Sequence, residues 1–362
     1  MDCAYFNHPE SQSSGIATQE LLSPDKGGGS SAVGGQLGPE QPLLSGGTLA
    51  PLSSGHSTTE LEMMDLELLH HFTTSTYQTI STDEDIREVW RLVVPQIALS
   101  HEFLMHAVLA MSALHLSALG SRDKPYAMAA AEHHSRALGP LRTALPVLNS
   151  EHANALMATS SLTALYAFAC RPGAGDLLPT APTWIPLFRG IMETMYACWN
   201  LICNGELMPL WGRKDIDKGS YDGEDIEFPS SLFDLSQRGT PGEPDPKELE
   251  DDHVLEVYHR ATEELKNSLD LFRSTAPRVA SAFAWPCSMQ DELLRFIEEQ
   301  RPRALILVAH HCVILESVEE QYWWVKGRGV DELRRIEGVL DEKWKRWLEW
   351  PMAKCKISKG PG

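Results

Sequence analysis

The sequence has no surplus of basic residues. Its 362 residues include 31 Lys and Arg against 50 Asp and Glu, a formal net charge of −19 at pH 7. Affinity for nucleic acid comes mainly from Lys and Arg that neutralise phosphates, so this balance argues against a nucleic-acid contact made by these residues. The basic residues near the end, Lys354, Lys356 and Lys359, are interpreted as a solvated tail.

Paired cysteines and targeting signals are also missing. The seven cysteines stand apart at positions 3, 170, 198, 203, 287, 312 and 355, and none has Cys-x-x-Cys spacing. Their odd number, with no secretory signal peptide and no Asn-x-Ser/Thr sequon, favours a reduced intracellular compartment. The most apolar stretch, 97–119, contains three histidines and Glu102, whose insertion cost argues against a membrane span.

Motifs for nucleophilic, phosphate or metal chemistry are absent from the sequence. There is no Gly-x-Ser-x-Gly elbow, and the glycine-rich run 27–35 lacks the Gly-Lys-Ser/Thr ending of a phosphate loop. His101 and His106 are five residues apart, so on a helix their side chains diverge by roughly 140° and cannot share a metal ion. We therefore predict no catalytic residue and no metal site.

Three pairs of adjacent histidines need a separate interpretation. Neighbouring residues on a helix do not face each other, so one histidine of each pair is expected to pack while the other reaches solvent. The pairs are at 70–71, 133–134 and 310–311.

An acidic run, Asp251, Asp252 and Glu256, has the spacing of the magnesium-binding carboxylates of class I terpene cyclases. Those enzymes need a second metal-binding helix, and no such pattern follows residue 260. Acids at a helix start also favour the positive end of its dipole. We interpret the run as the start of a helix, and an all-α biosynthetic enzyme stays as the alternative.

Helical patterns dominate after a segment at 1–58 that is rich in Gly, Ser and Pro and is expected to be a disordered linker. The spacings Thr59/Glu62 and Ser81/Glu84 fit capping boxes. Helices are predicted over about 60–72, 84–94, 101–119, 125–145, 150–170, 184–204, 248–273, 289–299, 302–322 and 329–349.

Two of these segments, 156–169 and 304–315, are apolar on almost every side and predict central buried helices. The sequence thus predicts a single all-α, multi-helix domain over 59–353, followed by a flexible tail at 354–362. A break rich in Gly, Pro and Asp at 205–246 is interpreted as a lid, a binding loop or a disordered insertion.

Aromatic residues gather near the C-terminal end, with Tyr322 followed by tryptophans at 323, 324, 344, 347 and 350. They either pack the end of the helical body or help to wall a cavity for an apolar ligand. Ligand pockets are concave and mostly apolar, and methionines would give such walls adaptability.

Several segments together resemble the regulatory domain of fungal zinc-cluster transcription factors, in particular the sterol uptake control group. They occur in the same order over about 60–351 and are LELLHHFTTSTY (66–77), VVPQIALSHEFLMH (93–106), LAMSALHL (109–116), LFRGI (187–191), ALILVAHH (304–311), WW (323–324) and WLEWP (347–351).

The resemblance implies a transcriptional regulator, not an enzyme, acting in the nucleus and cytoplasm on lipid, sterol or secondary-metabolite genes. Cys3 is similar to the last of the six cysteines of the zinc cluster, and the other five have no counterpart. Either a naturally short form or a sequence that begins too late explains this. Binding of zinc and of DNA would then be functions of the module that contains the other five cysteines.

The resemblance also implies a helical domain that senses an apolar small molecule, such as a sterol or a related metabolite. The residues that we expect to line its pocket are Phe103, Met111, Phe168, Trp199, Ala309 and Trp323. Further expected partners are the transcription machinery and a second copy of the chain. A dimerising interaction module is the other alternative.

Overall fold

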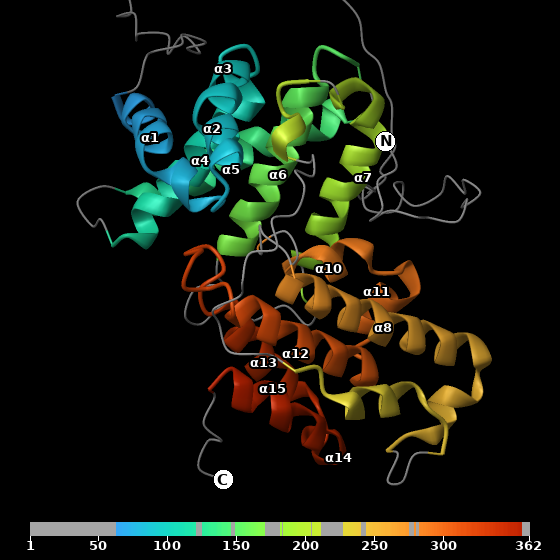
Figure 1. Ribbon diagram of the computed structural model, residues 1–362. Helices are drawn as coiled ribbons and strands as arrows, with labels where there is room; N and C mark the ends of the chain where they lie inside the picture. Colours follow the sequence, from blue (N-terminus) through green and yellow to red (C-terminus); the bar gives the residue numbers. More distant parts are fainter. Residues whose placement is uncertain are drawn as a thin grey trace, which may run out of the picture. The chain divides into compact units, whose positions relative to one another are not determined.

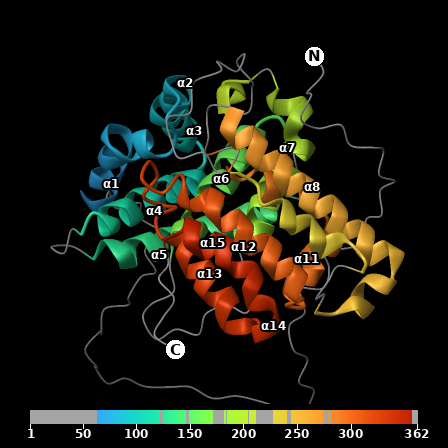
Figure 2. The same cartoon turned by 60° about the horizontal axis from the view of Figure 1, so that its bottom comes forward.

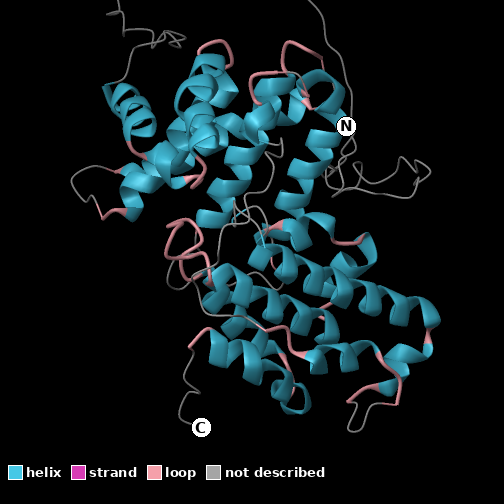
Figure 3. Cartoon of the chain, viewed as in Figure 1, coloured by secondary structure: helices cyan, strands magenta, loops and turns pink. Residues whose placement is uncertain are grey.

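The structure is a computed structural model that describes residues 63–120, 125–145, 149–170, 182, 184–203, 205–210, 227–239, 244–274, 279 and 282–356. All regular elements within these residues are helices and none is a strand (Figure 3). The predicted all-α fold class is therefore confirmed. The segment 1–58 with Cys3, and the capping pair Thr59 and Glu62, lie outside the described residues.

A first group of helices packs around α4. These helices are α1 (Met63–Thr74), α4 (Glu102–Ala118), α5 (Tyr126–Ala144), α6 (Ala153–Ala169) and α7 (Trp184–Ile202). Helix α4 contacts α1, α5 and α6, and α6 contacts α7 (Figure 1). The predicted ranges for these helices agree with the structure to within a few residues.

A second group packs around α12. Its helices are α8 (Asp252–Ser274), α10 (Ala284–Ser288), α11 (Asp291–Glu298), α12 (Pro302–Glu316), α13 (Arg328–Val339), α14 (Glu342–Lys345) and α15 (Glu349–Lys354). Helix α12 contacts α8, α11, α13 and α15 (Figure 2). Helix α10 contacts both α7 and α8, which joins the two groups.

The two helices predicted to be central are buried as expected. In α12 every residue from Arg303 to Leu315 is buried, and α6 is buried along most of its length. One hydrophobic cluster includes residues of both helices. Truncating a large core side chain of this kind to alanine costs about 2–5 kcal/mol, so these helices anchor the fold.

The connection from α1 to α4 contains four short elements. They are a 3-10 turn (Thr76–Thr79), α2 (Glu84–Glu88), a π-helical turn (Val89–Val93) and α3 (Val94–Ala98). Asp83 caps α2, because its carboxylate accepts the backbone N–H groups of Asp85 and Ile86 at 2.9 and 3.2 Å. The expected cap at Ser81 is wrong, since the Ser81 hydroxyl accepts only the Asp83 N–H.

Two predicted helices are shorter than expected. The predicted helix 302–322 ends at Glu316, and the predicted helix 329–349 breaks at Leu340 and Asp341, which are extended. The break lets Trp344 enter the core, where it is 1% exposed. Of the predicted loop 205–246, the described parts include 3-10 turns at Met208–Leu210 and Ser230–Ser236, and its role stays a prediction.

Arg303 fastens the segment before α8 onto α12. Its guanidinium donates to the carbonyl oxygens of Leu235 and Asp245 at 3.1 and 2.8 Å, and pairs with the Glu248 carboxylate at 2.5 Å. It also lies over the ring of Trp344. Because Arg303 is only 1% exposed, its charge depends on these partners, and losing them would leave it buried and unpaired.

Candidate functional site

Aromatic rings meet where the two groups of helices join. We call this set the aromatic centre: Phe168, Trp184, Phe188, Phe283 and Trp324. The ring of Phe168 lies 5.2 Å from those of Trp184 and Phe283, 5.6 Å from Phe188 and 6.0 Å from Trp324. These edge-to-face contacts join α6, α7, the residue before α10 and the segment after α12.

A buried imidazole borders the aromatic centre. His311 of α12 lies between Trp184 and Trp285, and its Nε2 is 2.7 Å from the Ala282 carbonyl oxygen. Burial lowers the pKa of His311 to about 4, so the ring is neutral near pH 7. Nε2 then carries the proton, and Nδ1 is a buried acceptor without a hydrogen-bond partner among the described residues.

Three consecutive aromatic residues after α12 bind the turn that follows α1. We call this contact the aromatic clasp: Tyr322, Trp323 and Trp324 with Thr79 and Thr82. The indole of Trp323 donates to the Thr79 hydroxyl at 2.9 Å, and that of Trp324 to the Thr79 carbonyl at 3.1 Å. The Tyr322 hydroxyl donates to the Thr82 hydroxyl at 3.3 Å. The clasp therefore holds together segments that are 240 to 244 residues apart in sequence.

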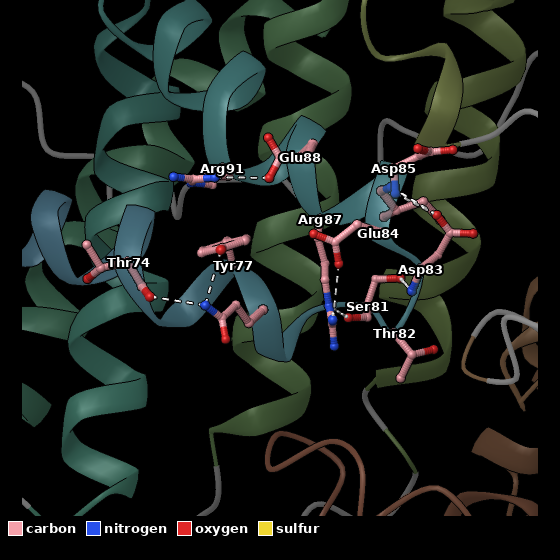
Figure 4. A network of polar contacts seen from close by, with 12 residues as sticks. Thr74, Tyr77, Ser81, Thr82, Asp83, Glu84, Asp85, Arg87, Glu88 and Arg91 are labelled. Carbon is pink, nitrogen blue, oxygen red and sulfur yellow. Dashed lines mark hydrogen bonds and ion pairs between the residues drawn. The ribbon is translucent and has the colours of Figure 1, made fainter.

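A network of polar side chains supports the threonine side of the clasp (Figure 4). Arg87 Nε donates to the Ser81 carbonyl at 2.7 Å, and its guanidinium pairs with Glu84 at 3.4 Å. One helical turn further, Arg91 pairs with Glu88 at 3.1 Å. Together with the Asp83 cap, these contacts fix the backbone that carries Thr79 and Thr82.

His115 of α4 connects the clasp to α1. Its ring stacks on Trp323 with centroids 5.0 Å apart, and its Nδ1 lies 3.0 Å from the Thr76 hydroxyl and 3.3 Å from Nε2 of His71. Burial is the main cause that lowers the pKa of His115 to about 4. A neutral His115 is thus part of the contact, and protonating it would place a charge against the uncharged side chains of Thr76 and His71.

A second imidazole pair links α4 to α5. Nδ1 of His106 and Nδ1 of His133 are 3.0 Å apart, and Nε2 of His133 is 3.3 Å from the Asp65 carboxylate of α1. Burial lowers the pKa of both rings, and the nearby carboxylates oppose that effect. The expectation that one histidine of each adjacent pair reaches solvent is wrong for His310 and His311, which are both buried because α12 is covered on every side.

A small apolar hollow lies between α8, α12 and α15. Its cavity volume is about 10 Å³, room for roughly one water molecule. The residues lining it are Phe228, Pro229, Leu265, Leu269, His310, Val313, Ile314 and Trp350. Inside it, His310 stacks on Trp350 with centroids 5.4 Å apart. Burial lowers the pKa of His310 to about 4, which makes this hollow apolar and uncharged near neutral pH.

The residues expected to line a ligand pocket lie in different parts of the core. Met111, Phe168 and Ala309 are fully buried. Phe103, Trp199 and Trp323 pack against the edge of the core. Phe168 belongs to the aromatic centre, and Trp323 to the adjoining clasp. None of the six lines the hollow described above, although Ala309 precedes His310 in α12.

The residues considered for metal or catalytic chemistry have structural partners. Asp252 pairs with Arg238 at 2.5 Å, and the Asp251 carboxylate accepts the His253 N–H at 2.8 Å at the start of α8. Across the described residues, no group of three or more His, Cys, Asp or Glu is placed to hold a metal ion. No helix in that part of the chain is both long and apolar enough to cross a membrane.

Comparison with known proteins identifies the domain. Residues 67–203 match the family model described as fungal specific transcription factor domain. The range 67–203 therefore has the sequence of a fungal specific transcription factor domain. The resemblance recognised in the sequence is confirmed, and the matched range covers α4 to α7, His115 and the threonine side of the clasp.

Several curated relatives extend the match beyond this regulator domain. The chain is 25% identical over 311 residues to a Zn(2)-C6 fungal-type transcription factor of Gibberella zeae, covering 80% of this chain and 61% of the relative. It is 26% identical over 262 residues to the transcription factor afumD of Aspergillus fumigatus, covering 69% and 67%. It is 31% identical over 150 residues to sterol uptake control protein 2 of Saccharomyces cerevisiae, covering 39% and 16%. The chain thus spans about three fifths of the first relative.

Sequence reasoning missed most of the clasp. It singled out the three aromatic residues 322–324 but not their partners Thr79, Thr82 and His115. The run of three aromatic residues after an apolar helix was the available signal. Its acceptors were not recognisable, because threonines in a polar turn have no distinctive pattern of their own.

Proposed function

We propose that this chain is the regulatory part of a transcriptional regulator of the fungal zinc-cluster type. The observation that carries the proposal is the family match over residues 67–203. In this proposal DNA is contacted through a zinc cluster, as in relatives whose names contain Zn(2)-C6. Zinc belongs to that cluster alone, and the acidic chain acts in the nucleus and cytoplasm through transcription-machinery partners.

The proposed signal is an apolar small molecule, a sterol or related metabolite, that controls lipid, sterol or secondary-metabolite genes. Two places support it: the hollow between α8, α12 and α15, and the aromatic centre, which contains the expected pocket residue Phe168. Pockets for drug-sized ligands measure about 300–1,000 Å³. Binding at the hollow therefore requires Phe228 and Trp350 to move apart.

A thermal-shift titration of the chain with ergosterol, cholesterol and farnesol tests the sensing role. A ligand at 100 times its Kd adds about 2.7 kcal/mol of stability, which raises Tm by roughly 5 °C in a domain of this size. If no compound of this class shifts Tm, the sensing role is wrong, while the family membership is unaffected.

Two variants locate the ligand. Leu265→Phe fills the hollow, and Phe168→Leu opens the aromatic centre. The variant that abolishes the shift identifies the pocket, with Leu99→Phe at the exposed residue after α3 as control. If both variants keep the full shift, neither place is the pocket.

The enzyme alternative has less support. Its carboxylates Asp251 and Asp252 have contacts that explain them as the start of α8. For the proposed homodimer, the molar mass of the purified chain by light scattering gives a direct test. A single-chain mass at micromolar concentration would remove the dimer from the proposal.

A further inference from the structure

Thr82 is the exposed member of the aromatic clasp. Its hydroxyl accepts the hydrogen bond from Tyr322 at 3.3 Å, yet the residue itself is exposed. The neighbouring Ser81 is 3% exposed, and its hydroxyl accepts the Asp83 N–H at 3.1 Å. Of these two adjacent hydroxyls, the one that an enzyme can reach from solvent is therefore that of Thr82.

Three carboxylates follow Thr82 without interruption: Asp83, Glu84 and Asp85. Figure 4 shows Thr82 beside Asp83, at the start of α2. An uninterrupted acidic run after a hydroxyl suits a kinase whose substrate groove carries Lys and Arg, because complementary potentials select the partner. Ser288 is a useful comparison within the chain, since it is exposed but its first following acid is Asp291, three positions on.

We propose that Thr82 is a phosphorylation site for an acid-directed Ser/Thr kinase, and that its phosphorylation opens the aromatic clasp. The γ-phosphoryl group of ATP is transferred to Thr82 Oγ1. The bond between the γ-phosphorus and the bridging oxygen breaks, ADP leaves with that oxygen, and the base of the kinase takes the hydroxyl proton.

The charges around Thr82 explain why the clasp opens. A phosphate adds a charge of about −1.5 to −2 near pH 7. It would stand beside Asp83, which caps α2, and close to Glu84 and Asp85. Arg87 is the nearby cation, but it already donates to the Ser81 carbonyl and pairs with Glu84. The repulsion between these anions therefore exceeds the attraction to Arg87.

The burial of Tyr322 also favours opening of the clasp once Thr82 is phosphorylated. Tyr322 is 1% exposed, and burial raises its pKa. A hydrated phosphate cannot occupy the contact between its hydroxyl and Thr82 without moving one of them. Releasing Tyr322 also loosens Trp323 and Trp324, because the three residues are consecutive and their other acceptor is Thr79.

Opening of the clasp and phosphorylation are coupled in both directions. A kinase binds its substrate in an extended form, whereas Glu84 and Asp85 begin α2. The clasp and the first turn of α2 must therefore open before the transfer. By linkage, whatever opens the clasp speeds phosphorylation, and phosphate at Thr82 keeps the clasp open.

The test incubates the full chain with MgATP and a purified acid-directed Ser/Thr kinase, and in parallel with a basic-directed one, and maps the phosphate by peptide mass spectrometry. We expect incorporation at Thr82 by the first kinase only, and none at that peptide in Thr82→Ala. The triple variant Asp83→Asn, Glu84→Gln, Asp85→Asn keeps a capping side chain and should react at least about tenfold more slowly. No phosphate on Thr82, or phosphate on Ser288 in its place, overturns the site.

The opening of the clasp has its own measurements. Tyr322→Phe removes one hydrogen bond and keeps the ring, so it should raise the initial rate about fivefold. Hydrogen exchange of 79–82 and 322–325 should be faster in the phosphorylated chain than in the unmodified one. Unchanged exchange, or a rate in Tyr322→Phe equal to that of the wild type, overturns the opening.

Discussion

Helices α4 and α12 each contact several neighbours, but they do so through different chemistry. Helix α4 meets α1 and α5 through imidazole pairs, His71 with His115 and His106 with His133. Helix α12 is buried from Arg303 to Leu315, and its one charged buried side chain stands at its start. The interfaces of α4 therefore contain paired imidazoles, whereas those of α12 combine apolar packing, one buried ion pair and two single imidazoles, His310 and His311, each bonded to a backbone carbonyl.

Lowering the pH should have the largest effect on stability, because buried imidazoles lie in the interfaces of both α4 and α12. Burial lowers the pKa of His115, His134, His310 and His311 to about 4, against about 6.5 when unfolded. Between pH 4 and 6.5 the unfolded chain binds more protons, so stability is complete above pH 6.5 and falls as the pH drops. We expect a loss on the order of 5 kcal/mol from pH 6.5 to 4.5, measured by urea unfolding.

One carboxyl works against this loss. Burial, with the adjacent Glu319, raises the pKa of Glu316 to about 7, so this group adds stability as the pH falls from 7 to 4.5. It offsets part of the loss, because a half-exposed carboxyl is screened by solvent. His134→Phe keeps the stacking on Tyr166, and His310→Phe the stacking on Trp350. Each should reduce the slope by about 1.4 kcal/mol per pH unit, and a flat profile in the wild type would contradict the prediction.

Removing the buried cation of α12 should have the next largest effect. Arg303→Ala leaves the Glu248 carboxylate and the carbonyls of Leu235 and Asp245 without their donor. We expect a loss of about 3–5 kcal/mol in the free energy of unfolding. Arg136→Ala on α5 is the matched control, because its pair with Glu132 is exposed and is worth less than about 1 kcal/mol. Equal effects of the two variants would contradict the role of Arg303 as the buried partner of Glu248.

A glycine pair in α13 gives the smallest and most specific test. A Cβ at Gly329 would lie 2.7 Å from the Cys312 carbonyl oxygen, whereas a Cβ at Gly338 meets nothing within 4 Å. Gly329→Ala should therefore cost about 1–3 kcal/mol, because the backbone of α12 cannot yield. Gly338→Ala should stabilise by about 0.5–1 kcal/mol through helix propensity. Urea unfolding compares the two variants. Stabilisation by both would show that α13 lies farther from the α12 backbone at Gly329 than this contact requires.

The sequence predicted the parts of the fold that depend on local patterns. The helical class, the boundaries of α4 to α7 and the buried character of 156–169 and 304–315 follow from the periodicity and continuity of apolar residues. The break at Leu340 did not follow, because the apolar pattern continues through it to Trp344. Local pattern therefore predicted helical content better than helix ends.

The contacts of the candidate site depend on long-range pairing, which a single sequence does not reveal. Trp323 and Thr79 are 244 residues apart, and Arg303 and Glu248 are 55 apart. The rule that adjacent helix residues point in different directions holds for His310 and His311, but it did not predict that both would be covered. That outcome needs neighbours on every side of α12, which only the tertiary structure provides.

The π-helical turn at Val89–Val93 also determines how the chain tolerates changes in length. A π turn holds one more residue than an α turn, so deleting one residue within it would restore an α-helix and leave the register of α3 unchanged. Val94 and Ala98 would then stay in the core, and Leu99, now 68% exposed, would stay outside it. Homologous sequences with a single-residue gap here therefore keep the same face of α3 inward, with an α turn in place of the π turn beside the clasp.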